Sequence, residues 1–231
     1  MTPEAVAVDI SPTDRVTALL YRAAEPAGIT LILGHGAGAG QNSSFMVMAA
    51  NELARRGIDA ITFNFLYTEH RRRLPDRNDR LEACYGAVIE TFADKVIHRT
   101  HGRNALAIGG KSMGGRIASQ VAAKAPLDLA GLVYLGYPLH PPGKPDQLRA
   151  QHLPAIRAPM LFVQGSHDAF GTPDELRPIL AKLGPSAELF VIEGGDHSFK
   201  VAKKAGIPQQ DVYKAILDRV AEWLVARRPH A

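Results

Sequence analysis

The segment Ala105–Gly115 constrains the fold more than any other, because a short apolar run passes directly into a helical pattern. Ala105 to Gly109 are apolar or small and predict a buried strand. Gly110-Lys111-Ser112-Met113-Gly114 follows, with a glycine two residues on either side of the serine. A strand that turns straight into a helix holds its central residue in a strained conformation, and the glycines let neighbouring backbones come close. The pattern predicts an outward-facing Ser112 that a base and a substrate can both reach.

Strands and helices alternate along the rest of the chain. Short apolar runs predict strands at Thr30–Leu33, Ala60–Phe65, Ala105–Gly109, Leu132–Leu135, Pro159–Gln164 and Glu188–Ile192. Val16–Arg22 reads as an antiparallel edge strand with a short partner at Val6–Ile10. Helical spacing is found around Phe45–Leu53, in the stripe Leu81, Tyr85, Val88, Ile89, Phe92 and Val96, and at Pro173–Leu183 and Gln210–Arg227. We therefore expect one α/β domain over residues 1–231, with a mostly parallel twisted sheet of about eight strands flanked by helices.

Composition sets further limits. Apolar residues make up 46% of the chain and charged residues 22%, as in an ordinary globular protein. The net charge of +4 is too weak to indicate a nucleic-acid partner. A single cysteine, Cys84, excludes an internal disulfide, and its helical position predicts a core or boundary residue. Met1–Ile10 does not resemble a signal peptide, and no apolar run approaches the ~20 residues of a membrane span. We expect a cytoplasmic monomer or homodimer that does not bind membranes.

Three polar residues follow predicted strands and share one edge of the sheet. Ligands of open α/β sheets gather outside the carboxyl ends of the strands, where Ser112, Asp168 and His197 would lie. A serine hydroxyl is barely ionised at neutral pH, so a nucleophilic Ser112 needs a base, and His197 follows the last strand. Asp168 would orient and stabilise that imidazole. Rival acids are Asp174 and Glu175, and rival histidines are His35, His70, His140 and His167.

The loop after the first parallel strand, Gly34–Gly40, is rich in glycine and predicts close approach of backbone to a ligand. A tetrahedral intermediate on Ser112 needs amide donors, which Met113 and Ala37 would supply, with Gly38 as the alternative to Ala37. Candidate substrate contacts are His35, Gly38, Tyr137 and His167, although His35 is also expected to anchor its own loop. We predict no metal and no cofactor.

The chain resembles the α/β-hydrolases nearly end to end. Narrower stretches resemble a small dienelactone-hydrolase-like subfamily that is similar to the hydrolase-like domain of a eukaryotic chromatin-complex subunit. These stretches are Phe63-Asn64-Phe65, Gly136–Pro145 and Gly194–Phe199. The resemblance implies the triad Ser112, Asp168 and His197 and the oxyanion amides Ala37 and Met113. It implies hydrolysis of a small carboxylic ester or a thioester through an acyl-enzyme.

The chain departs from the resemblance in two places. Dienelactone hydrolases have a cysteine nucleophile where this chain has Ser112, so their substrate is not carried over. Leu66 stands where the subfamily often has proline, which bears on local loop shape. In addition, only about 20 residues separate Tyr137 from the strand at Pro159, too few for a separate cap domain. We expect a site that is open or covered only by the Leu139–Gln151 loop.

Other interpretations of the same motifs remain. A non-catalytic α/β-hydrolase-like binding scaffold would keep the fold and the triad. Gly110-Lys111-Ser112 echoes a phosphate-binding loop, but that motif needs a glycine where Ala105 stands. Gly34–Ala39 loosely fits a dinucleotide turn, with Asp59 as its acidic residue. The arginine-rich segment Glu69–Glu82 is either a self-paired surface or the source of one arginine that holds a substrate carboxylate.

Overall fold

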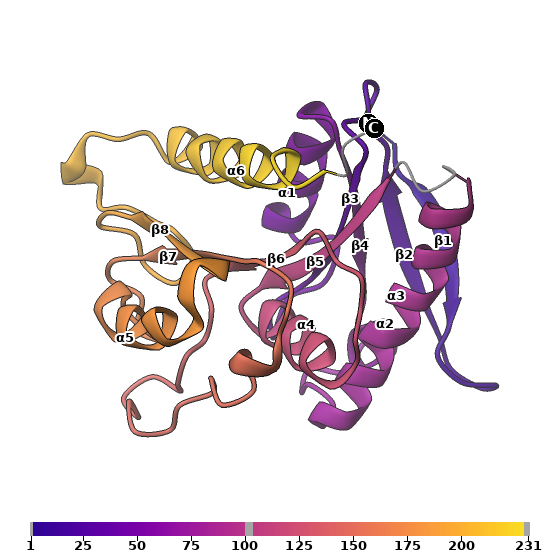
Figure 1. Ribbon diagram of the computed structural model, residues 1–231, viewed down its shortest axis with the longest axis horizontal. Coiled ribbons are helices and arrows are strands. Elements are labelled where there is room, and N and C mark those ends of the chain that lie inside the picture. The colour runs from indigo at the N-terminus through magenta and orange to yellow at the C-terminus, as the bar shows by residue number, and fades with distance from the viewer. Residues whose placement is uncertain (1, 100–103, 229–231) are drawn as a thin grey trace.

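The computed structural model describes residues 2–99 and 104–228, with side chains described for 2–93 and 104–228. An eight-stranded sheet in the order β1-β2-β4-β3-β5-β6-β7-β8 forms its centre (Figure 1). Its strands are β1 (Glu4–Asp9), β2 (Arg15–Tyr21), β3 (Ile29–Gly34), β4 (Ile58–Phe63), β5 (Ala105–Lys111), β6 (Gly131–Leu135), β7 (Met160–Gly165) and β8 (Ala187–Ile192). From β4 to β8 every neighbouring pair is parallel, and the pairs β1–β2 and β2–β4 are antiparallel. The predicted mostly parallel sheet is confirmed.

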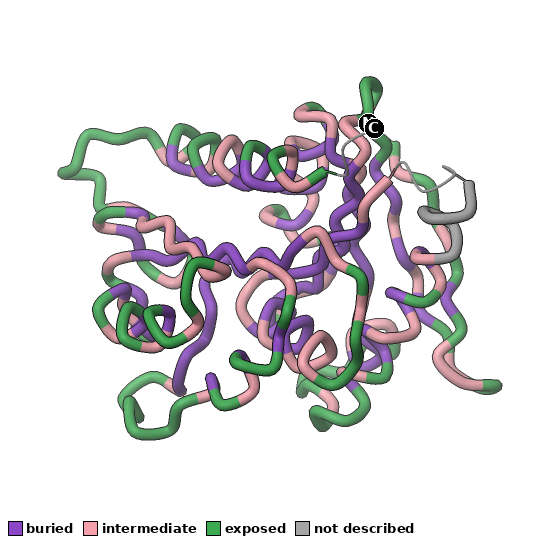
Figure 2. Tube along the Cα trace, in the orientation of Figure 1, coloured by how far each residue is buried: buried purple, intermediate pink, exposed green. Residues whose placement is uncertain are grey.

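Helices cover both faces of this sheet (Figure 1). They are α1 (Ser44–Arg55), α2 (Leu66–Glu69), α3 (Asn78–Arg99), α4 (Met113–Lys124), α5 (Pro173–Leu183) and α6 (Gln209–Val225). Along β3, Leu31 and Leu33 pack in the core shared with α1 and α6, while Ile32 packs in the core shared with α3, α4 and α5. Because successive side chains point to opposite faces, a strand buried on both faces is apolar throughout. Figure 2 shows this continuous buried path through the central strands.

The ends of the predicted strands differ from the observed ones by one or two residues, and two differences affect the sheet order or the site. Val16–Arg22 was expected at the edge, but β2 lies between β1 and β4, so β1 is the edge strand. The pairing of β2 with β4 joins distant segments and leaves no local sequence signal. The strand expected at Ala105–Gly109 continues to Lys111 and so delivers the chain directly to Ser112.

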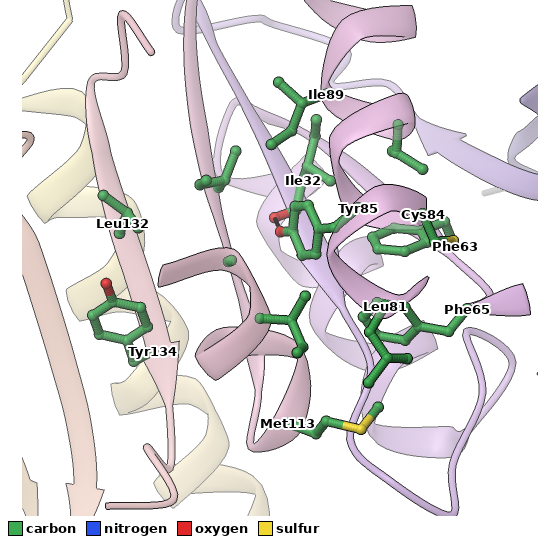
Figure 3. Close-up of a cluster of buried hydrophobic side chains, with 14 of the residues drawn as sticks. Ile32, Phe63, Phe65, Leu81, Cys84, Tyr85, Ile89, Met113, Leu132 and Tyr134 are labelled. Atoms are coloured by element: carbon green, nitrogen blue, oxygen red, sulfur yellow. Dashed lines mark hydrogen bonds between the residues drawn. The ribbon is translucent and has the colours of Figure 1, made fainter. Parts of the chain in front are cut away.

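Tyr85 links the α3 side of the core to the middle of the sheet (Figure 3). Its hydroxyl oxygen lies 2.9 Å from the carbonyl oxygen of Ile32 and 2.6 Å from that of Gly109, shares its single proton between them, and accepts from the Gly109 N–H (3.0 Å). Phe63 packs edge-on against its ring at 5.0 Å. The hydroxyl therefore ties β3 to β5 just before the turn that carries Ser112.

Helix α3 buries one stripe of side chains in the core. Leu81, Tyr85, Val88, Ile89 and Phe92 form the predicted buried stripe, whereas the side chain of Val96 lies outside the described residues. Cys84 is fully buried among them, and burial raises the pKa of its thiol to about 12. It is a core residue, as predicted.

Candidate active site

Ser112 occupies the turn between β5 and α4 in a strained backbone conformation. Its φ is 51° and its ψ is −115°, values that a residue with a β-carbon rarely adopts. Helix α4 begins at the next residue, Met113. The surrounding structure holds this strain, and the serine side chain lines a cavity instead of packing into the core.

The glycines of the motif are required by close backbone contacts. A β-carbon on Gly114 would lie 2.1 Å from the carbonyl oxygen of Gly34, and one on Gly110 would lie 2.3 Å from the same atom. Gly110 also has a φ of 156°. The turn can therefore press against the end of β3 only while both positions lack a side chain.

A chain of hydrogen bonds joins Ser112 to His197 and Asp168. The distance from Ser112 Oγ to His197 Nε2 is 2.8 Å, and His197 Nδ1 lies 2.8 and 2.9 Å from the two carboxylate oxygens of Asp168. Asp168 is 1% exposed and also accepts from Gln164 Nε2 (2.9 Å) and from the N–H of Phe170 (2.8 Å). A carboxylate held this way favours the tautomer with the proton on Nδ1, which leaves Nε2 free to accept the serine proton.

His197 is held from several sides. The Lys111 ammonium donates to the His197 carbonyl oxygen at 2.6 Å and lies 5.2 Å from the ring centre of Phe199. Phe170 stacks on the imidazole at 4.1 Å. The turn itself is fixed by Asp196, whose Oδ1 accepts two backbone N–H groups. These contacts set the orientation of the imidazole independently of Ser112.

Lys111 is a residue of this site that the sequence interpretation missed. Burial lowers the pKa of its ammonium to about 8, while the nearby carboxylates Asp168 and Asp196 oppose this shift. The signal available in the sequence was its place inside the serine motif, at the end of a buried strand where a lysine is unusual.

The amides expected to bind an oxyanion lie at the same cavity. Ala37 and Met113 both line it together with Ser112. A β-carbon on Gly36 would lie only 3.6 Å from Cβ of Ser112, so the loop that carries Ala37 packs against the serine. Met113 is the first residue of α4, where a helix leaves its amide N–H groups without internal acceptors. The arrangement provides the amides for an oxyanion hole, whose role stays a prediction.

His35 does not contact the cavity. Its ring is fully buried, Nδ1 bonds to the Gly36 carbonyl oxygen at 2.8 Å, and Nε2 accepts the N–H of Phe65 at 3.2 Å. Both ring nitrogens are thus occupied, and burial lowers the pKa of the imidazole. The ring anchors its own loop, which corrects its assignment as a candidate substrate contact.

The other three candidate substrate contacts also lie away from the cavity lining. Tyr137 is fully buried, its N–H donates to Gln164 Oε1 (2.8 Å), and its hydroxyl donates to the Arg149 carbonyl oxygen (2.7 Å). His167 and Gly38 are exposed but do not line the cavity. Tyr137 positions the following loop, which corrects its assignment, whereas Gly38 and His167 stay predictions.

The cavity at Ser112 has a volume of about 620 Å³. Between β6 and β7 the only regular element is a short 3-10 turn, Leu153–Ala155, so no separate cap domain covers the described site. Pro138 and Arg149 supply one wall, at the two ends of the predicted Leu139–Gln151 loop. Its other lining residues include Met113, Leu81 and Phe170, which give the site an apolar part.

The arginine-rich segment Glu69–Glu82 pairs largely with its own neighbourhood. The ion pairs are Arg72–Asp76 (2.7 Å), Arg77–Asp79 (3.6 Å) and Arg80–Asp14 (3.9 Å). Of the five arginines in this segment, none lines the cavity in the part of the chain that the structure describes. The structure favours the self-paired surface over an arginine from this segment that reaches a substrate.

The nucleotide-binding interpretations do not fit the backbone. Residues 105–111 form strand β5, so no phosphate-cradling loop precedes Lys111 and Ser112. Asp59 lies inside β4, where its carboxylate accepts the N–H of Ala23 at 2.8 Å. Among the side chains described for residues 2–93 and 104–228, no cluster of three or more His, Cys, Asp or Glu residues is placed to hold a metal ion. Within the same residues, no helix is both long and apolar enough to cross a membrane.

Solved structures with the same fold include two that match the chain almost end to end. A serine hydrolase without a lid from Xanthomonas campestris is 21% identical, with a TM-score of 0.70, covering 100% of this chain and 97% of that one. A dienelactone hydrolase from Anabaena variabilis is 20% identical, with a TM-score of 0.73, covering 99% of this chain and 100% of that one.

A cold-adapted esterase from an Arctic intertidal metagenomic library is 16% identical, with a TM-score of 0.64, covering 95% of this chain and 92% of that one. At these identities the likeness concerns the fold. The resemblance to a chromatin-complex subunit stays a prediction.

The family model described as an alpha/beta hydrolase domain matches residues 27–225, from the start of the parallel sheet to the end of α6. The chain belongs to the alpha/beta hydrolase family.

Proposed function

We propose that the protein is a serine hydrolase that cleaves a small carboxylic ester, or a thioester, through an acyl-enzyme on Ser112. The observation that carries this proposal is the unbroken line of hydrogen bonds from Ser112 through His197 to a buried Asp168, opening into a cavity. A serine in that arrangement is activated for attack, because its proton has an acceptor at hydrogen-bond distance.

The geometry supports a two-step reaction. Ser112 Oγ attacks the carbonyl carbon of the ester while its proton passes to His197 Nε2, and the amides of Ala37 and Met113 stabilise the oxyanion. The bond to the leaving group then breaks, and the imidazolium returns the proton to the departing alcohol or thiol. In the second step, water attacks the acyl group with His197 again as the base, which releases the acid and restores Ser112.

Labelling with a fluorophosphonate probe tests this proposal. Such a probe is captured only by a serine whose base and oxyanion donors already cooperate. We expect the wild-type protein to be labelled, and both Ser112→Ala and His197→Ala to lose the label. A matched control is Ser44→Ala, because Ser44 lines the same cavity from α1 but is not hydrogen-bonded to a histidine in the described structure.

The same experiment addresses the alternative function. If folded wild-type protein is not labelled, the site does not work as a nucleophile, and the binding scaffold becomes the better interpretation. If the label survives in Ser112→Ala, the nucleophile lies elsewhere and the proposal is wrong.

A further inference from the structure

The cavity at Ser112 carries an excess of positive charge. Lys111, Arg116, Arg149 and Lys200 line it, and Asp76 is the carboxylate among its described lining residues. Asp76 is already paired with Arg72 at 2.7 Å. A cleft walled mainly by cations attracts anionic ligands and raises their local concentration.

Two of these cations, Arg116 and Arg149, have no acidic partner among the described residues. The guanidinium of Arg116 donates to Gln120 Oε1 (3.2 Å) and to Asn78 Oδ1 (3.3 Å), both neutral amides. Elsewhere in the described chain the half-buried Arg56 and Arg227 each pair with carboxylates. The guanidinium groups at the cavity are thus left with capacity for an anion.

The position of Arg116 is unfavourable for an unpaired cation. Burial lowers the pKa of its guanidinium, and the nearby charge of Arg149 acts in the same direction, while the charge of Glu82 opposes both effects. It also lies in the first turn of α4, where the positive end of the helix dipole disfavours a cation. Costs that are compensated only in part are typical of functional sites, where a ligand supplies the missing charge.

Both arginines line the cavity that contains the nucleophile. The Arg116 N–H donates to the Ser112 carbonyl oxygen at 3.1 Å, so Arg116 lies one helical turn, about 5.4 Å, after the serine. Its guanidinium is held between Gln120, one turn further along α4, and Asn78 at the start of α3, and the residue lines the same cavity as Ser112. Arg149 is fixed through its main chain, which donates to Leu139 and accepts from the hydroxyl of Tyr137.

We propose that Arg116 and Arg149 form a subsite for a carboxylate of the substrate. The preferred substrate is then an ester or thioester of a dicarboxylic acid, in which a methylene chain separates the free carboxylate from the scissile carbonyl. The paired guanidinium groups bind the carboxylate by charge-assisted hydrogen bonds, and the apolar lining formed by Met113 and Leu81 accepts the methylene chain. This inference rests on the proposed esterase activity.

The test compares two esters that differ in one charge. The first is mono-para-nitrophenyl glutarate, and the second is its neutral methyl ester. We expect wild-type protein to hydrolyse the anionic ester with the higher kcat/KM, and the ratio of the two values to fall about tenfold or more in Arg116→Met and in Arg149→Met. Arg116→Lys retains the charge and should retain part of the ratio.

A matched control separates this local effect from the general loss of a positive charge. Arg157 is exposed, lies outside the cavity and forms no ion pair in the described structure. Arg157→Met should leave the ratio as it is in the wild type. If Arg157→Met lowers the ratio as much as Arg116→Met does, long-range charge accounts for the preference and the subsite is refuted.

The outcomes distinguish this inference from the proposed function. If neither ester is hydrolysed and the fluorophosphonate label is absent, the proposed function fails, and the subsite fails with it. If the two esters react equally well in the wild type, the esterase proposal stands and the carboxylate subsite is overturned. Competitive inhibition by glutarate should exceed that by inorganic phosphate, and the reverse order would overturn the assignment to a carboxylate.

Discussion

The turn around Ser112 and the segment Glu69–Glu82 are both conspicuous in the sequence, yet the structure holds them in different ways. The turn is fixed by the backbone, where Gly110 and Gly114 press against Gly34. The segment is held by side-chain ion pairs: Arg77–Asp79 is exposed, and Arg72–Asp76 joins a partly exposed guanidinium to a buried carboxylate. A pattern that restricts the backbone therefore located the candidate site, whereas a run of charges marked a surface.

The largest effect is expected when the hydrogen-bond chain to Ser112 is disabled and the backbone of the turn is left intact. Asp168→Asn should lower kcat by about 10³–10⁴-fold, because an amide no longer selects the imidazole tautomer that accepts the Ser112 proton. Steady-state kinetics on a para-nitrophenyl ester, with circular dichroism as the check on folding, measures this. A folded variant with nearly normal kcat would mean that Asp168 does not take part.

The second prediction tests whether backbone contact holds the turn. Gly114→Ala should lower the free energy of unfolding by about 3 kcal/mol or more, since its β-carbon would lie 2.1 Å from the Gly34 carbonyl oxygen. The matched variant Gly38→Ala places a β-carbon in open space at a φ of 74° and should cost only about 1 kcal/mol. Urea unfolding of the two variants gives the difference. Equal losses would show that close approach at Gly114 does not matter.

The third prediction concerns the buried cation within the turn. Lys111 has a pKa of about 8 in the folded protein against an ordinary value of 10.5, so between these pH values the unfolded chain binds more protons. The contribution of Lys111 to the free energy of unfolding should therefore rise with pH across this window, by at most about 1.4 kcal/mol per unit.

Urea unfolding of the wild type and of Lys111→Met at several pH values from 8 to 10.5 measures this contribution as the difference between the two proteins. A difference that stays constant over that range would show that the Lys111 ammonium is not destabilised by burial.

The smallest effect is expected in the arginine-rich segment. Arg77→Ala should change the free energy of unfolding by less than about 1 kcal/mol, because both side chains of the Arg77–Asp79 pair are exposed. It should also leave the preference between the anionic and neutral glutarate esters unchanged. A loss of preference comparable to that in Arg116→Met would show that an arginine of this segment contacts the substrate.

Most strands and helices could be predicted closely because each has its own local pattern of apolar residues. The continuous apolar runs located the parallel strands, and the predicted helix Pro173–Leu183 matches α5 residue for residue. The place of β2 inside the sheet could not be predicted, since pairing between distant strands depends on the tertiary structure.

The residues of the candidate site likewise divide into those that a local sequence pattern predicts and those that it does not. Ser112, Asp168 and His197 were found because each lies in the turn or loop that follows a strand, and the structure brings them together. Arg116 and Arg149 were not found, because an isolated arginine on a helix or in a loop carries no pattern. Whether such a residue is paired with a carboxylate becomes apparent only when distant segments are placed in space.

The strained backbone at Ser112 also bears on how this protein can change over time. A φ of 51° at a non-glycine residue lowers stability by about 1–3 kcal/mol, and a glycine there would relieve most of it. Selection for thermal tolerance alone would thus favour losing the serine side chain. If close relatives of this protein keep the serine although a glycine would be more stable there, selection for the function of the serine accounts for it.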